Sequence, residues 1–188
     1  MMKKIPTPLN DLYIIEPIIF RDDRGYFSEQ YNEQKFSELG FHFHFVQDNQ
    51  SKSSYGVIRG LHYQLFPYAQ TKLVRVLKGS IFDVAVDIRK GSPTFGKWYG
   101  IELSEDNMLQ LLVPRGFAHG FSVLSDTAIV FYKCDNLYNP QSERGINFAD
   151  PELNIDWKID INKAVVSAKD KVLPNLKNAD FNFKYGNI

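Results

Sequence analysis

The chain has 188 residues, which is enough for one well-buried domain over residues 1–188 and too short for two comfortable ones. Apolar residues at 44% and charged residues at 23% exclude an intrinsically disordered chain, and the formal net charge of zero argues against a nucleic-acid binder, which would carry a basic excess. The single cysteine, Cys134, excludes an internal disulfide, and the N-terminus has the pattern of neither a signal peptide nor a membrane anchor, so we expect a cytoplasmic protein.

Short apolar runs separated by turn residues occupy most of the chain up to about Lys133. Many short strands at regular spacing are typical of an all-β sandwich or barrel. We predict strands at Leu12–Phe20, Tyr26–Tyr31, Phe41–Asn49, Val57–Gln64, Thr71–Lys78, Ser80–Ile88, Lys97–Leu103, Met108–Val113, Ala118–Val123 and Thr127–Cys134.

Two short helices are also predicted. The first spans Asn32–Leu39, where Asn32 is a suitable N-terminal cap and two apolar residues share one face. The second spans Ser167–Leu173, where Ser167 and Asp170 have the spacing of a capping box with Asp in place of Glu.

Strand alternation within residues 41–49 predicts which side chains point inward. The three phenylalanines of this segment share a face with Gln47 and Asn49, so both amides extend an apolar face into the interior and need partners there, for which a bound ligand is one candidate. His42 and His44 have the His-x-His spacing of metal-binding β-barrels, but they point the other way and no Glu follows a few residues on. We therefore predict a surface role for both histidines and no metal site.

The segment 59–76 holds the most distinctive polar group of the chain, which is His62 with two nearby cations, Arg59 and Lys72, in a predicted β-hairpin. Lys72 shares a face with apolar residues and is expected to point inward. Simple alternation puts Arg59 and His62 on opposite faces, but a bulge at Gly60 would bring both to one side. A histidine beside fixed positive charge suits proton abstraction and stabilisation of the resulting anion, and a purely structural histidine is an equal alternative at this point.

Four further residues have ordinary structural interpretations. His119 is a candidate core histidine in an aromatic strand, and Tyr132 and Tyr138 are candidate packing residues. Asp170 is a candidate carboxylate at a helix terminus. Their residue types alone do not separate these roles from functional ones.

Motifs spread along the chain form a highly specific set when taken together. They are Arg59-Gly60-Leu61-His62-Tyr63-Gln64, Gln70-Thr71-Lys72-Leu73-Val74-Arg75-Val76, Phe20–Phe27, Gln47–Ser51, Asp83–Arg89, Ser92–Gly96, Pro114–Phe121, Tyr138–Pro140 and Ser167–Asp170. This set resembles the dTDP-4-dehydrorhamnose 3,5-epimerase family of the cupin superfamily, and the resemblance covers roughly residues 10–175.

The resemblance implies a cupin-type double-stranded β-helix, or jelly-roll, barrel that is usually a homodimer and acts without metal or organic cofactor. The implied reaction converts a dTDP-linked 4-keto-6-deoxyhexose, dTDP-4-dehydro-6-deoxy-D-glucose, to dTDP-4-dehydro-L-rhamnose, with no nucleic acid or membrane as partner. His62 would be the general base, oriented by Asp170. Tyr132 would be the acid on the opposite face, and Lys72 would stabilise the enolate oxygen. The nucleotide-sugar site would be lined by Arg24, Phe27, Glu29, Gln47, Asn49, Arg59, His119, Tyr138, Glu143 and Lys169.

The residue types fit this chemistry independently. Inversion of a carbon next to a ketone needs a base that removes its proton, a cation at the ketone oxygen and a proton source on the other face. Neutral histidine, with an ordinary pKa of about 6.5, is a usable base at physiological pH. Guanidinium groups such as those of Arg24 and Arg59 match the oxygens of a diphosphate, and aromatic faces suit the thymine ring.

Other functions stay open from the sequence. A related enzyme that inverts only C3 or only C5 would carry the same base and acid, so the motifs do not separate it from a 3,5-epimerase. A non-catalytic sugar-nucleotide-binding cupin is disfavoured because binding alone needs no base. A metal-dependent cupin oxygenase is disfavoured because its His/Glu ligand set is missing.

Overall fold

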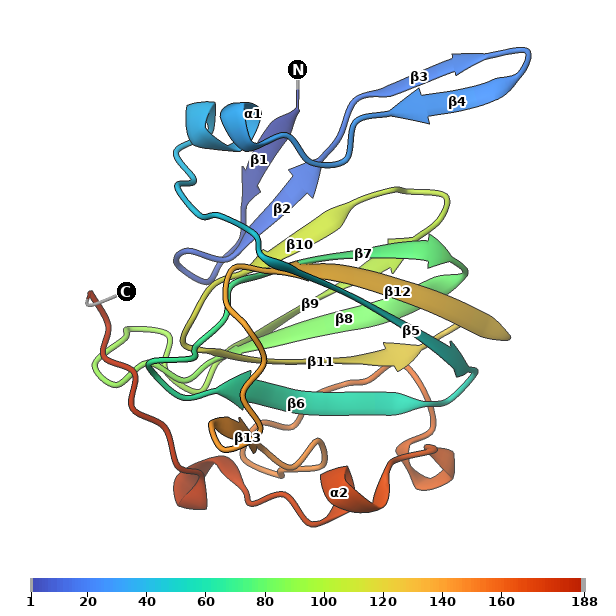
Figure 1. The fold of residues 1–188 in the computed structure, drawn as a ribbon. Helices are drawn as coiled ribbons and strands as arrows, with labels where there is room; N and C mark the ends of the chain where they lie inside the picture. The colour runs from blue at the N-terminus through green and yellow to red at the C-terminus, as the bar shows by residue number, and fades with distance from the viewer. Residues whose placement is uncertain (1, 187–188) are drawn as a thin grey trace.

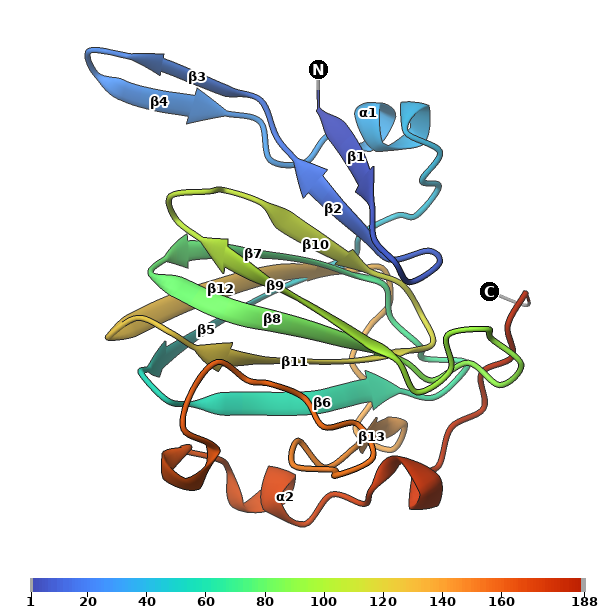
Figure 2. The ribbon, with the colours of Figure 1, turned by 180° about the vertical axis from the view of Figure 1, so that it is seen from behind.

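Two antiparallel sheets that face each other form the body of the computed structural model, which describes residues 2–186 (Figures 1 and 2). This arrangement confirms the predicted all-β, cupin-type jelly-roll class. One sheet has the strand order β1 (Lys3–Pro6), β2 (Tyr13–Glu16), β10 (Gln110–Val113), β7 (Lys72–Lys78), β12 (Thr127–Cys134) and β5 (Gln47–Ser54). The other has the order β13 (Glu143–Gly145), β6 (Ile58–Gln64), β11 (Phe117–Val123), β8 (Ser80–Asp87) and β9 (Trp98–Ser104).

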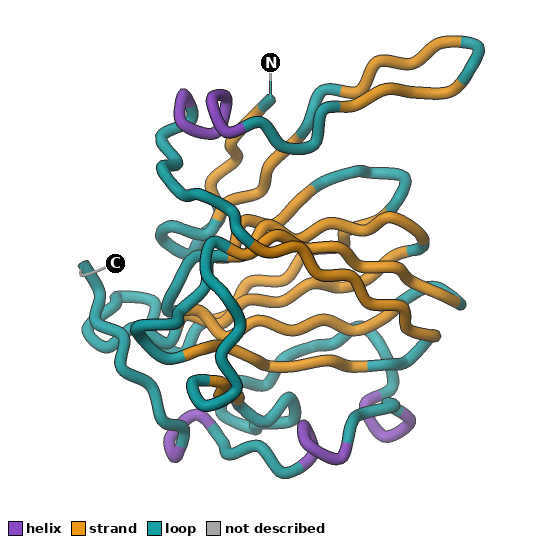
Figure 3. Tube along the Cα trace, in the orientation of Figure 1, coloured by secondary structure: helices purple, strands orange, loops and turns teal. Residues whose placement is uncertain are grey.

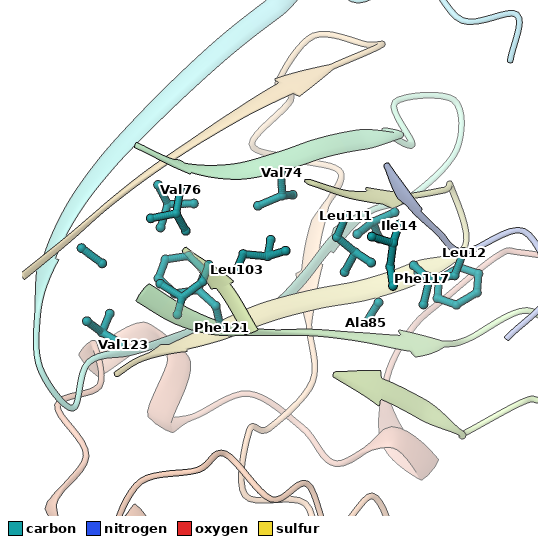
Figure 4. Close-up of a cluster of buried hydrophobic side chains, with 14 of the residues drawn as sticks. Leu12, Ile14, Val74, Val76, Ala85, Leu103, Leu111, Phe117, Phe121 and Val123 are labelled. Atoms are coloured by element: carbon teal, nitrogen blue, oxygen red, sulfur yellow. The ribbon is translucent and has the colours of Figure 1, made fainter. Parts of the chain in front are cut away.

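The main core lies between the two sheets, where alternate residues of each strand point inward (Figure 4). Val74 and Val76 of β7 belong to one buried cluster with Phe117 and Phe121 of β11, so side chains from both sheets form a single apolar layer. Polar residues that follow the same alternation, such as Lys72, therefore point into the same interior.

The C-terminal segment covers the outer face of the five-stranded sheet with loops and short helices (Figures 1 and 3). Trp157 and Phe183 of this segment are buried. The segment includes α2 (Ala168–Lys171) and two 3-10 turns, Ile161–Lys163 and Leu176–Asn178. Because α2 contacts β6, it can present a side chain to the strand that carries the candidate base.

A separate hairpin projects away from the body of the molecule (Figure 1). It is formed by β3 (Ile19–Asp22) and β4 (Gly25–Ser28). Its aromatic side chains are exposed to solvent, by 60% for Phe20 and 68% for Phe27. Such exposure of large apolar residues is typical of a surface that meets another molecule.

Both predicted helices are present with their predicted caps. α1 spans Glu33–Glu38, and the side chain of Asn32 accepts a hydrogen bond from the backbone N–H of Lys35. At α2 the hydroxyl of Ser167 accepts from the backbone N–H of Asp170. Side-chain capping therefore predicted where each helix begins.

The strand predictions hold best where the runs are apolar and uninterrupted. β12 spans Thr127–Cys134 as predicted. The single strand predicted at Leu12–Phe20 is wrong, because the chain forms β2 and β3 with Pro17 between them. Proline has no backbone N–H to donate to a ladder, so it interrupts the pairing.

The strand predicted at Phe41–Asn49 is wrong in its bounds, because β5 begins at Gln47. β5 lies at the edge of its sheet and has a polar sequence, so apolar patterning does not reveal it. Burial still alternates through residues 41–46, and His42 and His44 are exposed at the surface as predicted. The short strands β1 and β13 are not predicted from the sequence at all.

The β-hairpin predicted over residues 59–76 is wrong. β6 pairs with β11 and β13, whereas β7 pairs with β10 and β12, so the two strands belong to opposite sheets. The connection at residues 65–71 is too long for a tight turn and crosses from one sheet to the other. His62 and Lys72 therefore lie on opposite walls of the barrel.

The predicted bulge in β6 is confirmed. Along the pairing with β11, His62 is opposite His119 and Arg59 is opposite Phe121, so three steps on β6 match two steps on β11. The extra residue falls at Gly60 or its neighbour, so simple strand alternation no longer puts Arg59 and His62 on opposite faces.

Substitution of Gly60 is expected to destabilise the protein. Its φ of +119° is a conformation that L side chains rarely adopt, and an added Cβ would lie 2.6 Å from Cα of Gly120. Gly60→Ala should lower the free energy of unfolding by about 3 kcal/mol or more, because backbone strain and overpacking each cost about 1–3 kcal/mol. Gly91→Ala is the control, with a φ of +84° and no atom within 4 Å of the added Cβ. It should cost only about 1–2 kcal/mol, and equal losses in denaturant titrations of the two variants would contradict this prediction.

Candidate active site

A cavity of about 200 Å³ opens between the two sheets. Strands β6 and β13 supply one wall, and β5, β7 and β12 supply the other. The cavity brings together three of the predicted catalytic residues and four of the predicted substrate-binding residues. Its lining consists of Gln47, Asn49, His62, Tyr63, Gln64, Gln70, Lys72, Tyr132, Tyr138 and Glu143.

His62 is paired with Asp170, which lies 108 residues later in the chain. Nε2 of His62 is 2.8 Å from Oδ1 of Asp170, whose side chain is 5% exposed. The backbone N–H of Gly60 donates to Oδ2 of Asp170 at 3.2 Å, and the Ser167 cap fixes the backbone of α2. The carboxylate is therefore held in one place and can orient the imidazole.

The carboxylate of Asp170 is ionised near neutral pH. Burial acts to raise its pKa, but the hydrogen bond and charge of His62, together with the hydrogen bonds of Gly60 and Ser167, outweigh burial and lower the pKa overall. A carboxylate at Nε2 favours the tautomer that has its proton on this atom, so Nδ1 is the nitrogen able to accept a further proton.

Lys72 lies on the opposite wall, at the start of β7. Burial lowers the pKa of Lys72, while the nearby groups Cys134, Asp83 and Glu143 act to raise it. Within residues 2–186 its ammonium group makes no ion pair. Its charge is therefore available to an anion that forms in the cavity.

Tyr132 is on the same wall as Lys72, and the lysine Nζ lies 5.8 Å from the centroid of its ring. Burial and the nearby Cys134 raise the pKa of Tyr132, with a smaller opposing effect of Arg59. The hydroxyl is thus protonated at neutral pH and able to donate a proton from the side opposite His62.

A second histidine–aspartate pair lies beside the first. Nε2 of His119 is 2.8 Å from Oδ1 of Asp83, and both side chains are buried. His119 is directly opposite His62 on the neighbouring strand, but it is not among the residues that line the cavity. Its predicted contact with substrate therefore stays a prediction.

Asp83 belongs to a motif that was recognised in the sequence, but no role was predicted for it. It lies on the inward face of β8 together with Ile81 and Ala85, which are fully buried. Its Oδ2 atom is buried and has no hydrogen-bond partner among the described residues. A charged residue between two apolar residues on the same strand face is the signal that would have identified it.

Tyr138 and Glu143 line the mouth of the cavity, and Lys169 pairs with Glu143 there. The hydroxyl of Tyr138 donates to Oε2 of Glu143 at 2.8 Å, and Nζ of Lys169 lies 2.5 Å from the same oxygen. Burial acts to raise the pKa of Glu143, but the hydrogen bonds from Lys169 and Tyr138 lower it overall. Tyr138 is 51% exposed, so a face of its ring is available for stacking on a base.

Two amides line the cavity, and an arginine lies near it without lining it. Gln47 and Asn49 both line the cavity, as strand alternation predicted, and Nε2 of Gln47 donates to Oδ1 of Asn49 at 3.0 Å. Nε of Arg59 donates to the hydroxyl of Ser53 at 3.0 Å, and the charge of Arg59 is close enough to Tyr132 to act against the raised pKa of that tyrosine.

Three more predicted site residues that do not line the cavity lie on or next to the β3–β4 hairpin. Arg24, at the tip of the β3–β4 hairpin, is paired with Asp22 at 2.6 Å, and its side chain is 90% exposed. Phe27 is exposed on β4, and Glu29 pairs with Lys35 at 2.6 Å. The hairpin projects away from the body of the molecule (Figure 1), and none of its residues lines the cavity. A single chain therefore does not bring these residues to the cavity.

Metal-binding and membrane-spanning features can be assessed over residues 2–186. This part of the chain has no group of three or more His, Cys, Asp or Glu side chains that could hold a metal ion. None of its helices is long and apolar enough to cross a membrane.

Comparison with known proteins gives consistent matches over nearly the whole chain. The family model described as dTDP-4-dehydrorhamnose 3,5-epimerase matches residues 6–178. The crystal structure of dTDP-4-dehydrorhamnose 3,5-epimerase from Elizabethkingia anophelis NUHP1 is 60% identical in sequence, with a TM-score of 0.90, over 94% of this chain and 97% of that chain.

Two further structures carry bound nucleotide sugars. dTDP-6-deoxy-D-glucose-3,5-epimerase from Legionella pneumophila Philadelphia 1, in complex with dTDP-4-keto-L-rhamnose, is 49% identical with a TM-score of 0.92, over 96% of this chain and 95% of that chain. A 3'-monoepimerase from Streptomyces bikiniensis, in complex with dTDP-quinovose, is 33% identical with a TM-score of 0.87, over 92% and 87% of the two chains.

Proposed function

The chain belongs to the dTDP-4-dehydrorhamnose 3,5-epimerase family and is an isomerase, and we propose that it converts dTDP-4-dehydro-6-deoxy-D-glucose to dTDP-4-dehydro-L-rhamnose by inverting C3 and C5. The observation that best supports this proposal is a single cavity with the His62–Asp170 pair on one wall and Lys72 and Tyr132 on the other. A base and an acid on opposite walls can reach opposite faces of a flat enolate, and inversion requires both.

In the proposed mechanism His62 removes the proton from a carbon next to the C4 ketone. Nδ1 takes the proton, the C–H electron pair forms the C=C bond of the enolate, and the π electrons of the carbonyl move to its oxygen. Asp170 stabilises the imidazolium that forms. C3 and C5 flank the same ketone, so one base can serve both carbons in turn.

Lys72 stabilises the enolate oxygen. Burial disfavours its ammonium form when the cavity holds no anion, which is why the pKa of Lys72 is lowered. The negative charge that develops on the oxygen supplies the missing partner in a low-dielectric cavity, so the attraction is stronger in the transition state than in the ground state.

Tyr132 then returns a proton to the opposite face. The C=C electron pair takes the proton of the hydroxyl to form the new C–H bond, and the ketone is restored. His62 has gained one proton and Tyr132 has lost one, so the two residues return to their starting states by proton exchange with water.

At the mouth of the cavity, the ring of Tyr138 stacks on the thymine and Arg59 and Lys169 meet the diphosphate. The exposure of Tyr138, the ammonium group of Lys169 next to Glu143 and the nearness of Arg59 to Tyr132 support these roles. A cytoplasmic location is also proposed, in keeping with the free thiol of Cys134.

The proposed assembly is a homodimer in which the β3–β4 hairpin of one copy reaches the cavity of the other. Arg24 and Phe27 are exposed on a projecting hairpin and lie away from the cavity of their own chain. A partner's hairpin would bring a guanidinium to the diphosphate and an aromatic ring to the base.

Mixing two inactive variants tests this shared site. His62→Ala removes the base, and the double substitution Arg24→Ala, Phe27→Ala removes the hairpin contacts. After random exchange of subunits, half of the dimers would be mixed and each would hold one complete site, so about a quarter of the wild-type activity should return. If no activity returns although mixed dimers are present, the hairpin does not serve the partner's cavity.

Asp170→Asn is expected to lower kcat by about 10²-fold or more, because the amide cannot stabilise the imidazolium and can hold the wrong tautomer. The pKa of Asp170 is lowered in the folded protein, so its contribution to stability is present above about pH 4 and is lost as the pH falls through the lowered value. The variant should therefore lose less stability than the wild type below about pH 4 in thermal denaturation. An unchanged kcat would show that the pair has no part in proton transfer.

A single-position epimerase is the alternative reading of the same site. It is less favoured because the 3'-monoepimerase is 33% identical to this chain, against 49% and 60% for the two 3,5-epimerases. The deciding experiment incubates the purified chain with dTDP-4-dehydro-6-deoxy-D-glucose and reads the configuration at C3 and C5 from NMR coupling constants. Inversion at both carbons supports the proposal, inversion at one supports the alternative, and tight binding without conversion supports a non-catalytic cupin.

A further inference from the structure

The loop after β12 presents Tyr138 at the mouth of the cavity, yet little apolar burial holds it there. Leu137 and Tyr138 are 58% and 51% exposed. Gln64, which is 5% exposed, holds their backbone instead. Its Nε2 donates to the carbonyl oxygens of Tyr68 at 2.7 Å and Leu137 at 3.3 Å, and its Oε1 accepts from the backbone N–H of Asn139 at 2.6 Å.

Gln64 also belongs to the strand of the base. It lies two residues after His62 in β6, and both side chains line the cavity. A second amide acts in the same way, because Oε1 of Gln47 accepts from the backbone N–H of Tyr138 at 3.0 Å. Three successive residues, 137–139, are thus tied to strands of the cavity wall, and Gln64 holds the residue on each side of Tyr138.

We propose that Gln64 is a positioning residue that holds Tyr138 in place against the strand of His62 and thereby sets the affinity of the cavity for the nucleotide end of the substrate. This inference rests on the proposed function, in which the ring of Tyr138 stacks on the thymine. The amide of Gln64 is engaged by three backbone groups, so Gln64 acts on the nucleotide through the loop.

The hydrogen-bond requirement at this position is specific to an amide. Two carbonyl oxygens need donors and one N–H needs an acceptor, and only a side-chain amide supplies two donors together with an acceptor. Glutamate has the same size and keeps the acceptor, but it loses both donors and sets a negative charge against two carbonyl oxygens. Leucine loses all three hydrogen bonds. The affinity for dTDP should therefore fall in the order Gln64, Gln64→Glu, Gln64→Leu.

A double-mutant cycle on dTDP binding, measured by titration calorimetry, tests the inference. Gln64→Leu and Tyr138→Ala should each weaken binding by about 10-fold, the size expected for one aromatic stacking contact. The double variant should also weaken binding by about 10-fold, because the loop then has no ring to position. In turnover assays Gln64→Leu should raise KM and leave kcat close to the wild-type value.

Asn107→Leu is the matched control. The amide of Asn107 also makes three bonds to backbone: its Oδ1 accepts from the N–H groups of Ser104 and Leu109, and its Nδ2 donates to the carbonyl oxygen of Glu102. It lies in the β9–β10 turn, which supplies no residue to the cavity. This variant should lower the melting temperature without changing the dTDP affinity. If Gln64→Leu does not fold, Gln64→Glu takes its place in the cycle.

Two results would overturn the role of Gln64 alone. One is wild-type affinity for dTDP in both Gln64 variants, and the other is an additive loss of about 100-fold in the double variant, which would mean that Gln64 does not act through Tyr138. A wild-type chain that binds no dTDP would overturn the proposed function and this inference with it. The two kinds of failure are therefore distinguishable.

Discussion

Replacement of His62 by alanine is expected to lower kcat by about 10²–10⁴-fold, the range that general-base catalysis contributes. Hydrogen exchange should be lost at C3 and C5 together, because one imidazole, oriented by Asp170, serves both carbons. The affinity for dTDP should change by no more than about 3-fold, since the nucleotide contacts lie at the mouth of the cavity. Steady-state kinetics and calorimetry on the same preparation measure the two effects.

His44→Ala is the control for this variant. His44 is exposed at the surface and pairs with Glu33 at 3.0 Å, so its loss should leave kcat unchanged. A His62→Ala variant that still exchanged both hydrogens at the wild-type rate would show that the base is misassigned. Loss of exchange at one carbon alone would show that a second base serves the other carbon.

Replacement of Lys72 by methionine is expected to lower kcat by about 10²–10³-fold, the size of a lost oxyanion donor. Methionine keeps most of the length of the side chain and removes its charge. Burial lowers the pKa of Lys72, so the ammonium group costs stability in the empty cavity at neutral pH, and the variant should have a higher free energy of unfolding than the wild type. A loss of activity combined with a gain in stability is the signature of a charge that is retained for catalysis.

Lys133→Met is the matched control for Lys72. Lys133 lies next to Tyr132 in β12 but points away from the cavity and pairs with Asp48 at 2.9 Å. Its substitution should leave kcat unchanged and should not stabilise the protein. A Lys72→Met variant with kcat within about 3-fold of the wild type would contradict the role of the ammonium group as the oxyanion donor.

Local physical rules predicted several parts of this molecule from the sequence. Side-chain capping located the start of both helices, through Asn32 and Ser167. Strand alternation directed Gln47 and Asn49 to the interior, although the bounds of their strand were wrong. The conflict between alternation and function at Gly60 predicted a bulge, which is present. Each of these features depends on residues within a few positions of one another.

Features that depend on distant segments did not follow from the sequence pattern. His62 and Lys72 were placed in one hairpin, but β6 and β7 belong to opposite sheets although they are consecutive in the chain. The pairing of His62 with Asp170 was implied only by the family resemblance, because no local rule joins residues 108 positions apart. The role of Asp83 was not predicted, because its pairing with His119 depends on the register between β8 and β11, which the sequence does not reveal.

The amide network around the mouth of the cavity was missed for a similar reason. Gln64 sits inside a recognised motif, but its three partners lie in two separate loops that meet only in the folded chain. The β3–β4 hairpin shows what a family motif does not predict. Arg24 and Phe27 belong to such a motif and still lie away from the cavity of their own chain.

The central claim is that one cavity removes and returns a proton at both carbons that flank the ketone. The most direct test incubates the wild-type chain with dTDP-4-dehydro-6-deoxy-D-glucose in D₂O and follows C3–H and C5–H by NMR. The proposed mechanism predicts deuterium at both C3 and C5 of an L-configured product, and no deuterium at either carbon with His62→Ala. Deuterium at one carbon only, or a product without deuterium, would contradict it.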